Sequence, residues 1–349
     1  MKWTTLSAVI RSVVRLMQVA ILTRFLPKED FGTIAIATLF IGFTELFLDM
    51  GLSSAIIHRQ DITRQHYSSL FWFNVFTGLL LTALLWICSP LVSSYYHDDS
   101  LTRIIRLLSL NVLFSSIGRQ HLTLQQKKLN FKLMSLIDLL NSVLTMILAV
   151  VLAYTGFGVY SLVYSTIFSI AFPSLIYFTY GIIHDRNITF HFRLSDTYSY
   201  LKIGVYQIGS SFLDYCAREL DVFIISVTLG KDVLGVYSLC KKIVQMMYGI
   251  INPILTKVLT PLFALLQSAR AELKSKYLKL VELLSVINYP LYFMVALSAT
   301  AILKLLYGET YIEGHWILSF LAVNYGILSI ANPVGSLQVA LGRTDIGLI

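Results

Sequence analysis

The sequence has little charge. Only 13% of its 349 residues are Asp, Glu, Lys or Arg, and 56% are hydrophobic. A soluble domain carries about 25% charged residues. This balance excludes a solvated enzyme held by an anchor and predicts an all-α polytopic membrane protein.

Cysteine is also scarce, and catalytic motifs are absent from the sequence. Cys88, Cys216 and Cys240 lie far apart in apolar segments and form no CxxC pair, so we interpret them as small buried hydrophobes. The sequence has no phosphate-binding glycine loop, no Gly-x-Ser-x-Gly and no metal-spaced His/Cys cluster. We therefore expect no metal, no cofactor and no enzymatic activity. In a soluble chain, the net charge of +8 would suggest binding to nucleic acid. In a membrane chain the distribution of the charges matters more than their sum, and we expect no nucleic-acid partner.

What the sequence has is long apolar runs. A helix needs about 20 mostly apolar residues to cross the hydrocarbon core of a bilayer. Arg11 and Arg15 interrupt the first run, which is typical of a retained helix and not of a signal peptide. The segments that qualify are residues 4–26, 31–57, 68–92, 101–120, 132–155, 159–183, 200–229, 233–265, 277–303 and 314–341.

Basic residues alternate between the connectors. With the amino terminus in the cytoplasm, fifteen Lys and Arg residues fall on cytoplasmic connectors and only Lys28, Lys231 and Lys304 on the opposite side. Cytoplasmic loops of membrane proteins carry such an excess. The bias predicts a cytoplasmic amino terminus.

One short stretch occurs twice. Residues 26–35 read LPKEDFGTIA and residues 229–238 read LGKDVLGVYS, at an offset of 203. Both join two apolar segments by a tight turn and contain a glycine, Gly32 or Gly235. The match predicts two homologous halves, the alternative being chance similarity. In a membrane chain, duplicated halves indicate a transporter with its site between them.

The first segment has a polar stripe. Arg11 and Arg15 are four residues apart, and Ser7 and Gln18 continue the same helical face. Charge at the bilayer centre costs several kcal/mol, so such residues usually face a bundle interior or a watery cavity. Neither arginine has an acid on its own helix. We predict that Arg11, Arg15 and Gln18 line a cavity; alternatively, Arg11 snorkels toward the surface.

The seventh segment, the counterpart of the first, has a similar stripe. Paired stripes predict a hydrophilic cavity between two halves. The alternative is that Asp214 and Arg218 merely neutralise each other at i,i+4. The polar residues of this stripe are Gln207, Ser211, Asp214, Arg218 and Asp221.

Two further segments contribute candidates. Lys241 and Lys242 are adjacent, so only one can line a cavity, and Lys242 shares a helical face with Gln245. Glu45 and Asp49 lie near the inner end of the second segment, and we interpret Asp49 as a helix-end residue, not a proton site. Structural or gating roles are predicted for Gly32, Gly235, Asp49, Asp214 and Asp221.

Several short motifs follow one another along the chain. They are LTRFLPKEDFG at 22–32, DMGL at 49–52, LD at 220–221, LG at 229–230, LGVYS at 234–238, NPVGS at 332–336 and LGRTD at 341–345. In this order they resemble the motifs of bacterial polysaccharide flippases. The similarity is greatest to Wzx-like exporters of the colanic-acid type, within the multidrug/oligosaccharidyl-lipid/polysaccharide (MOP) flippase superfamily, and it implies a location in the bacterial inner membrane.

The resemblance implies two six-helix, MATE-like lobes around a cavity that works by alternating access. It implies a substrate of undecaprenyl diphosphate bearing an oligosaccharide repeat unit, turned to the outer leaflet for exopolysaccharide or lipopolysaccharide biosynthesis. Implied partners are the bilayer and the polysaccharide polymerase or export machinery. Arginine and lysine in the cavity, here Arg11, Arg15, Arg218 and Lys242, would meet the diphosphate, for which the guanidinium fork is suited.

The predicted lobes are unequal. Residues 1–190 would form the first lobe with six helices, and residues 191–349 the second with four, so we expect the sequence to be partial. A multidrug-type antiporter of the same superfamily is the alternative function, although it would favour an acidic cavity. A membrane glycan polymerase or glycosyltransferase would require a long outward loop, and the outward connectors of this sequence are short.

The charge bias generates a topology prediction. Cysteines introduced in the turns at 28–30 and 231–232 should react with a membrane-impermeant thiol reagent from outside, whereas cysteines near Lys127 or Lys274 should not. Labelling at Lys127 from outside would contradict the assignment.

Overall fold

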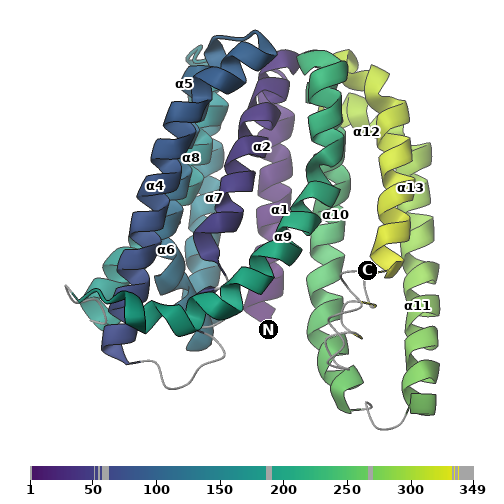
Figure 1. Ribbon diagram of the computed structural model, residues 1–349. Helices are drawn as coiled ribbons and strands as arrows, with labels where there is room; N and C mark the ends of the chain where they lie inside the picture. Colours follow the sequence, from purple (N-terminus) through teal and green to yellow (C-terminus); the bar gives the residue numbers. More distant parts are fainter. Residues whose placement is uncertain are drawn as a thin grey trace. The chain divides into compact units, whose positions relative to one another are not determined.

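The computed structural model describes residues 2–50, 52–53, 56, 63–185, 191–265, 270–331, 334 and 337, and every regular element in these ranges is helical. The elements follow one another as labelled in Figure 1. They are α1 (Lys2–Leu22), α2 (Lys28–Asp49), α4 (Arg64–Tyr96), α5 (Ser100–Leu108), α6 (Leu110–Lys127), α7 (Phe131–Tyr154), α8 (Val159–Tyr180), η1 (Gly181–Asp185), α9 (Leu194–Thr228), α10 (Gly230–Leu265), α11 (Arg270–Leu297), α12 (Ala299–Leu306), η2 (Glu309–Gly314) and α13 (His315–Ala331).

The helices have the character of membrane spans. Within the described residues, six are long and apolar enough to cross a bilayer: 28–49, 64–96, 100–127, 131–154, 159–184 and 271–297. Large apolar side chains such as Phe76, Ile87 and Leu91 of α4 are 64–73% exposed, as a surface facing lipid would be. The all-α, polytopic membrane class predicted from the sequence is confirmed.

The helix bounds differ from the predicted segments at several points. The segment predicted at 101–120 is divided between α5 and α6 at Ser109, and the one predicted at 277–303 between α11 and α12 at Ser298. Helix α2 ends at Asp49 instead of residue 57, because Met50 takes a left-handed conformation with φ of 42° that a helix cannot continue.

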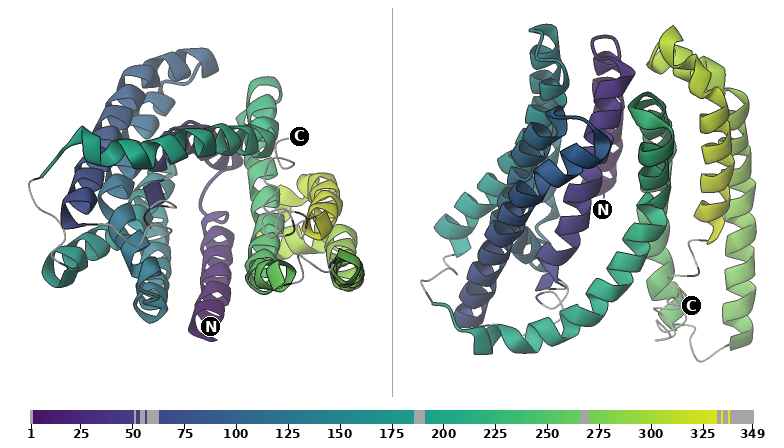
Figure 2. Two further views of the ribbon diagram at one scale, coloured as in Figure 1. Left: turned by 60° about the horizontal axis from the view of Figure 1, so that its bottom comes forward. Right: turned by 45° about the horizontal axis from the view of Figure 1, so that its top comes forward.

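The chain forms two compact units, residues 1–235 and 236–349. In the first unit α1 packs on α7, α6 on both α4 and α8, and the long helix α9 runs obliquely across α4 and α2 (Figures 1 and 2). In the second unit α11 and α13 lie side by side, with α12 and η2 packed at their ends. Helix α9 thus belongs to the first compact unit. The division into homologous lobes at residue 190 stays a prediction.

Small residues permit close helix packing in the first unit. A Cβ on Gly118 of α6 would lie 2.5 Å from the Cα of Ser174 on α8, and one on Gly78 of α4 would lie 2.5 Å from the Ser116 side chain on α6. Small residues at helix contacts let backbones approach in a membrane, where hydrophobic burial gives little drive for helix association. These glycines therefore fix how closely α4, α6 and α8 pack.

Gly118 provides a stability test. Gly118→Ala should lower the free energy of unfolding by about 1–3 kcal/mol, since the new methyl group meets backbone, which cannot move aside. Thermal unfolding of the purified protein in detergent measures the effect. Gly209→Ala in α9 is the matched control, because a Cβ there meets nothing within 4 Å. Equal melting temperatures for the two variants would contradict this account of packing.

Candidate functional site

A charged pocket lies where α2, α6 and α9 meet, within the first unit. It has a volume of about 340 Å³. Helix α2 contributes the i, i+3, i+4, i+7 face that begins at Gly42, and α9 contributes a face with the same periodicity. The lining residues are Gly42, Glu45, Leu46, Asp49, Met50, Arg119, Ile208, Ser211, Tyr215 and Arg218.

Asp49 is the best-held carboxylate of the pocket. Its Oδ1 accepts a hydrogen bond from Ser53 Oγ at 2.5 Å and lies 3.9 Å from Nη1 of Arg119 on α6. Thr123 Oγ1 donates to the Arg119 carbonyl oxygen at 2.9 Å and lies 3.2 Å from Ser53 Oγ. Asp49 therefore joins α2 to α6 besides ending its helix, and it leaves part of the Arg119 guanidinium open to the pocket.

Glu45 and Tyr215 line the middle of the pocket. Glu45 is half-buried one turn before Asp49 and feels the positive charge of Arg119. Tyr215 Oη donates to the carbonyl oxygen of Leu39 at 2.5 Å. A Cβ on Gly42 would lie 2.8 Å from this hydroxyl oxygen, so a glycine at 42 is what lets the tyrosine ring pack across α2.

Arg218 is the predicted cavity residue that the structure places in the pocket. It is exposed there, and its Nε donates to the Asp214 carbonyl oxygen at 3.3 Å. Asp214 itself is exposed on α9. Asp221 accepts a hydrogen bond on Oδ1 from the Val222 backbone N–H at 2.7 Å. The stripe thus divides: Ser211 and Arg218 line the pocket, and the two aspartates do not. The side chain of Gln207 lies outside the described residues.

Arg11 has an acid partner on a different helix. Its Nη1 donates to Asp138 Oδ2 on α7 at 2.7 Å, with the two side chains 40% and 33% exposed. Tyr177 of α8 lies beside this pair, near enough to feel both charges, and its hydroxyl is buried. The pair links α1 to α7, two helices that pack against each other. Arg11 is therefore neutralised within the protein, an outcome that neither sequence alternative contained.

The other residues of the first stripe are less enclosed. Arg15 is exposed on α1, Gln18 is half-buried, and Ser7 is buried. Arg15 lies one turn from Arg11 and feels its charge. The structure does not bring Arg15 or Gln18 into the charged pocket of α2, α6 and α9.

The remaining predicted residues lie near the start of α10 and α2. Lys241 is 5% exposed and Lys242 is exposed, so the two lysines do point apart. Gly32 and Gly235 are both buried. Each faces the backbone of the other repeat turn.

Sequence reasoning missed Arg119 and Asp138 as site residues. Arg119 was counted only among the cytoplasmic basic residues, and Asp138 is a lone acid in an apolar segment. An isolated intramembrane acid was itself the usable signal, because such a residue is expected to have a cationic partner. Among the described residues, no group of three or more His, Cys, Asp or Glu side chains could hold a metal ion.

The fold is similar to that of a solved membrane protein. The structure resembles a solved multidrug transporter of the MATE family and MOP superfamily, in its inward-facing conformation, with a TM-score of 0.73 at 17% identity over 97% of this chain and 85% of that one. The chain is therefore an all-α polytopic membrane protein that shares the fold of this structure.

Sequence comparison gives the family. A family model described as polysaccharide biosynthesis protein matches residues 21–314, and the chain belongs to that family. It is 28% identical over 347 residues to the teichuronic acid biosynthesis protein TuaB of Bacillus subtilis (strain 168), covering 99% of this chain and 71% of that protein. It is 26% identical over 348 residues to the lipopolysaccharide biosynthesis protein WzxC of Escherichia coli (strain K12), covering 99% and 70%. The predicted family resemblance is confirmed.

The Arg11–Asp138 pair can be tested by a double-mutant cycle. Asp138→Asn and Arg11→Gln should each lower the melting temperature, because each leaves the other charge without its partner. The double variant should recover part of the loss. We expect a coupling of about 0.5–1 kcal/mol, in the range of partly exposed pairs. Strictly additive losses would show that the two side chains do not interact.

Proposed function

We propose that the protein is a flippase that moves undecaprenyl-diphosphate-linked oligosaccharide repeat units from the cytoplasmic to the outer leaflet. The observation that supports this most directly is the pocket in which Arg119 and Arg218 converge from different helices, in a chain of the polysaccharide biosynthesis family. The pocket lies at the carboxyl-terminal end of α2, which the predicted topology places toward the cytoplasm, where such a substrate is made.

The two arginines suit a diphosphate. Each guanidinium can give two parallel N–H donors to phosphate oxygens, and charge-assisted bonds of this kind are about twice as strong as neutral ones. Arg218 is exposed and the side chain of Arg119 is 32% exposed, so both can be reached from the pocket. The pocket volume lies within the usual ~300–1,000 Å³ of ligand sites, enough for the headgroup while the polyprenyl chain stays in lipid.

The carboxylates have a complementary use. Glu45 and Asp49 can only accept hydrogen bonds when ionised, and sugar hydroxyls are donors. The flat ring of Tyr215 offers an apolar face beside them. In this proposal the arginines select the diphosphate and the acids contact the first sugar. No covalent chemistry is needed, so we propose a transporter and not an enzyme.

Arg15 and Lys242 stay proposed cavity cations. Both are exposed, Arg15 on α1 and Lys242 on α10. We propose that they contact the headgroup at a later stage of alternating access, between lobes at 1–190 and 191–349. We also propose a cytoplasmic amino terminus, an inner-membrane location and contact with polysaccharide polymerase or export machinery.

A multidrug-type antiporter is the second candidate. The presence of Glu45 and Asp49 in the pocket favours it, since acids attract cationic compounds. The two functions predict opposite consequences of removing the arginines: flipping of the anionic lipid would be lost, whereas cation efflux would be kept or improved.

Arginine variants test the proposed function. Arg119→Ala and Arg218→Ala should each weaken the use of the lipid-linked substrate by about tenfold or more, because each removes charge-assisted bonds. Lysine at either position should restore only part of the activity, since an ammonium keeps the charge and loses the fork. Restoration of polysaccharide export in a flippase-deficient strain, with membrane insertion checked in parallel, provides the measurement.

The matched control is Arg103→Ala on α5, which is exposed and does not line the pocket. Export should stay at the wild-type level in this variant. Normal export by the Arg119→Ala, Arg218→Ala double variant would overturn the proposal.

A further inference from the structure

The two copies of the repeat contact each other reciprocally. A Cβ on Gly32 of α2 would overlap the carbonyl oxygen of Lys231, and a Cβ on Gly235 of α10 would overlap the carbonyl oxygen of Lys28. Gly32 and Gly235 are equivalent under the offset of 203, and so are Lys28 and Lys231. Exchanging the two copies therefore turns the Gly32–Lys231 contact into the Gly235–Lys28 contact, as in the isologous interface of a twofold dimer.

The glycines are required by distance and not by backbone conformation. Both lie in the second turns of their helices, where any residue could adopt the dihedral angles. Any side chain at 32 or 235 would push the two helix starts apart, because its first atom meets backbone. Glycine at both positions permits an approach that alanine would prevent.

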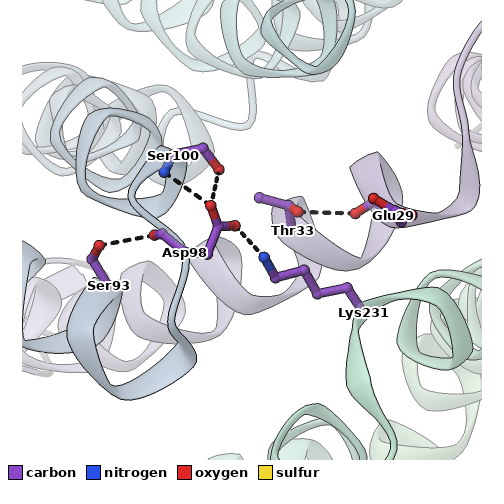
Figure 3. Close-up of polar contacts among 6 residues, drawn as sticks. All are labelled: Glu29, Thr33, Ser93, Asp98, Ser100 and Lys231. Atoms are coloured by element: carbon purple, nitrogen blue, oxygen red, sulfur yellow. Dashed lines mark hydrogen bonds and ion pairs between the residues drawn. The ribbon is translucent and has the colours of Figure 1, made fainter.

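An ion pair lies beside this contact. Asp98, between α4 and α5, accepts a bond on Oδ2 from Lys231 Nζ. Its Oδ1 accepts from the Ser100 backbone N–H at 2.9 Å and from Ser100 Oγ at 2.7 Å. Figure 3 shows Lys231 reaching from α10 to Asp98, with Thr33 and Glu29 of α2 alongside. Nearby, the hydroxyls of Tyr96 and Ser226 are 2.7 Å apart and join α4 to α9.

Asp98 is held in its charged form. Burial acts to raise its pKa, but the hydrogen bonds from Lys231 and Ser100 outweigh burial and lower the pKa below its usual value. A lowered pKa means that the bonds contribute at neutral pH and are lost only as the pH falls through that lowered value. The ion pair therefore exists under ordinary conditions.

These contacts have the properties of a reversible closure. The glycine contacts are van der Waals packing of backbone, which separates without leaving a buried charge. The side chains of Lys231 and Asp98 are 27% and 16% exposed, in turns that the predicted topology places on the outer side, so water can solvate both when they part. By contrast, separating a fully buried ion pair would cost several kcal/mol.

We propose that the turns at 28–32 and 231–235, with the Asp98–Lys231 ion pair, form an outer latch that closes the outward face and opens during transport. The inference rests on the proposed function, since a flippase must expose its substrate to each side in turn. It assigns the closing contact to two glycines and one ion pair.

A cysteine introduced at position 33 can show whether the latch is closed or open. Thr33 is 6% exposed beside Gly32, so a Thr33→Cys thiol should be protected while the latch is closed. The background would be the intact protein in right-side-out membrane vesicles without glycolipid, with Cys88, Cys216 and Cys240 replaced by alanine. The measured quantity is the rate of labelling by an impermeant maleimide.

Gly235→Ala should increase this rate by about tenfold or more, because the added methyl excludes the closed arrangement and shifts the population toward the open one. Asp98→Asn should give a smaller increase, and Asp98→Lys combined with Lys231→Asp should restore protection. Gly209→Ala is the control and should leave the rate unchanged, since its methyl meets nothing within 4 Å. A wild-type rate in both Gly235→Ala and Asp98→Asn would overturn the latch.

The labelling needs no substrate, so its result stands whether or not the arginine variants impair export. Export by Gly235→Ala separates the two ideas further. Faster labelling with reduced export supports a latch that works in transport. Faster labelling with normal export would overturn its role in the transport cycle. Unchanged labelling, with export lost only in the arginine variants, would overturn the latch and retain the flippase.

Discussion

The architecture of the first unit depends on a steric constraint at two glycines. Helices α2 and α10 begin very close together. A Cβ on Gly32 would overlap the carbonyl oxygen of Lys231, and a Cβ on Gly235 would overlap that of Lys28. Such an approach is available only where both chains lack a side chain. The equal spacing of the turn residues in both copies makes the contact symmetric, and the Asp98–Lys231 bond then ties it to α4 and α5. Equivalent positions of the two copies are also buried alike. The pairs Phe31 and Leu234, and Ile36 and Leu239, are related by the offset of 203, and all four residues are 0–3% exposed.

A second constraint is the handling of charge in an apolar chain. Asp138 neutralises Arg11, and Asp49 lies against Arg119, so acids on one helix meet arginines on another. Pairs between helices both satisfy the charges and fix the packing of the helices that carry them. Arg218 and Arg15 are also exposed. A site for an anionic headgroup requires such accessible cations.

Composition and periodicity predicted the helices well because a membrane imposes a simple rule of about 20 apolar residues per crossing. The repeat was equally readable, since Gly32 and Gly235 sit in matching ten-residue stretches. The partners of the charges were not readable. Nothing in the local sequence states that Asp138 meets Arg11 across 127 positions, or that Arg119 shares a pocket with Glu45. Those contacts depend on how α1, α2, α6 and α7 pack. A periodic pattern shows which residues share one face of a helix, but it does not show which other helix packs against that face. The stripe on α9 illustrates this, because Arg218 lines the pocket and Asp214, four residues earlier, does not.

Helix α2 carries residues of both the proposed latch, at Gly32, and the charged pocket, at Asp49. Gly32 lies in its second turn and Asp49 is its last residue, so the two are separated by about 25 Å at 1.5 Å per residue. A continuous helix transmits rotation and tilt over such a length with little loss. Asp49 and Glu45 face the pocket from the same helix side as Gly42, where Tyr215 of α9 is bonded to the Leu39 carbonyl oxygen. An anion that draws Arg119 and Arg218 together would pull on α6 and α9, and both contact α2. Any resulting tilt of α2 must change the fit at Gly32, where a Cβ already has no room. In the proposed transport cycle, binding of the headgroup at one end of α2 and closure at the other would therefore be coupled by the rigidity of a single helix.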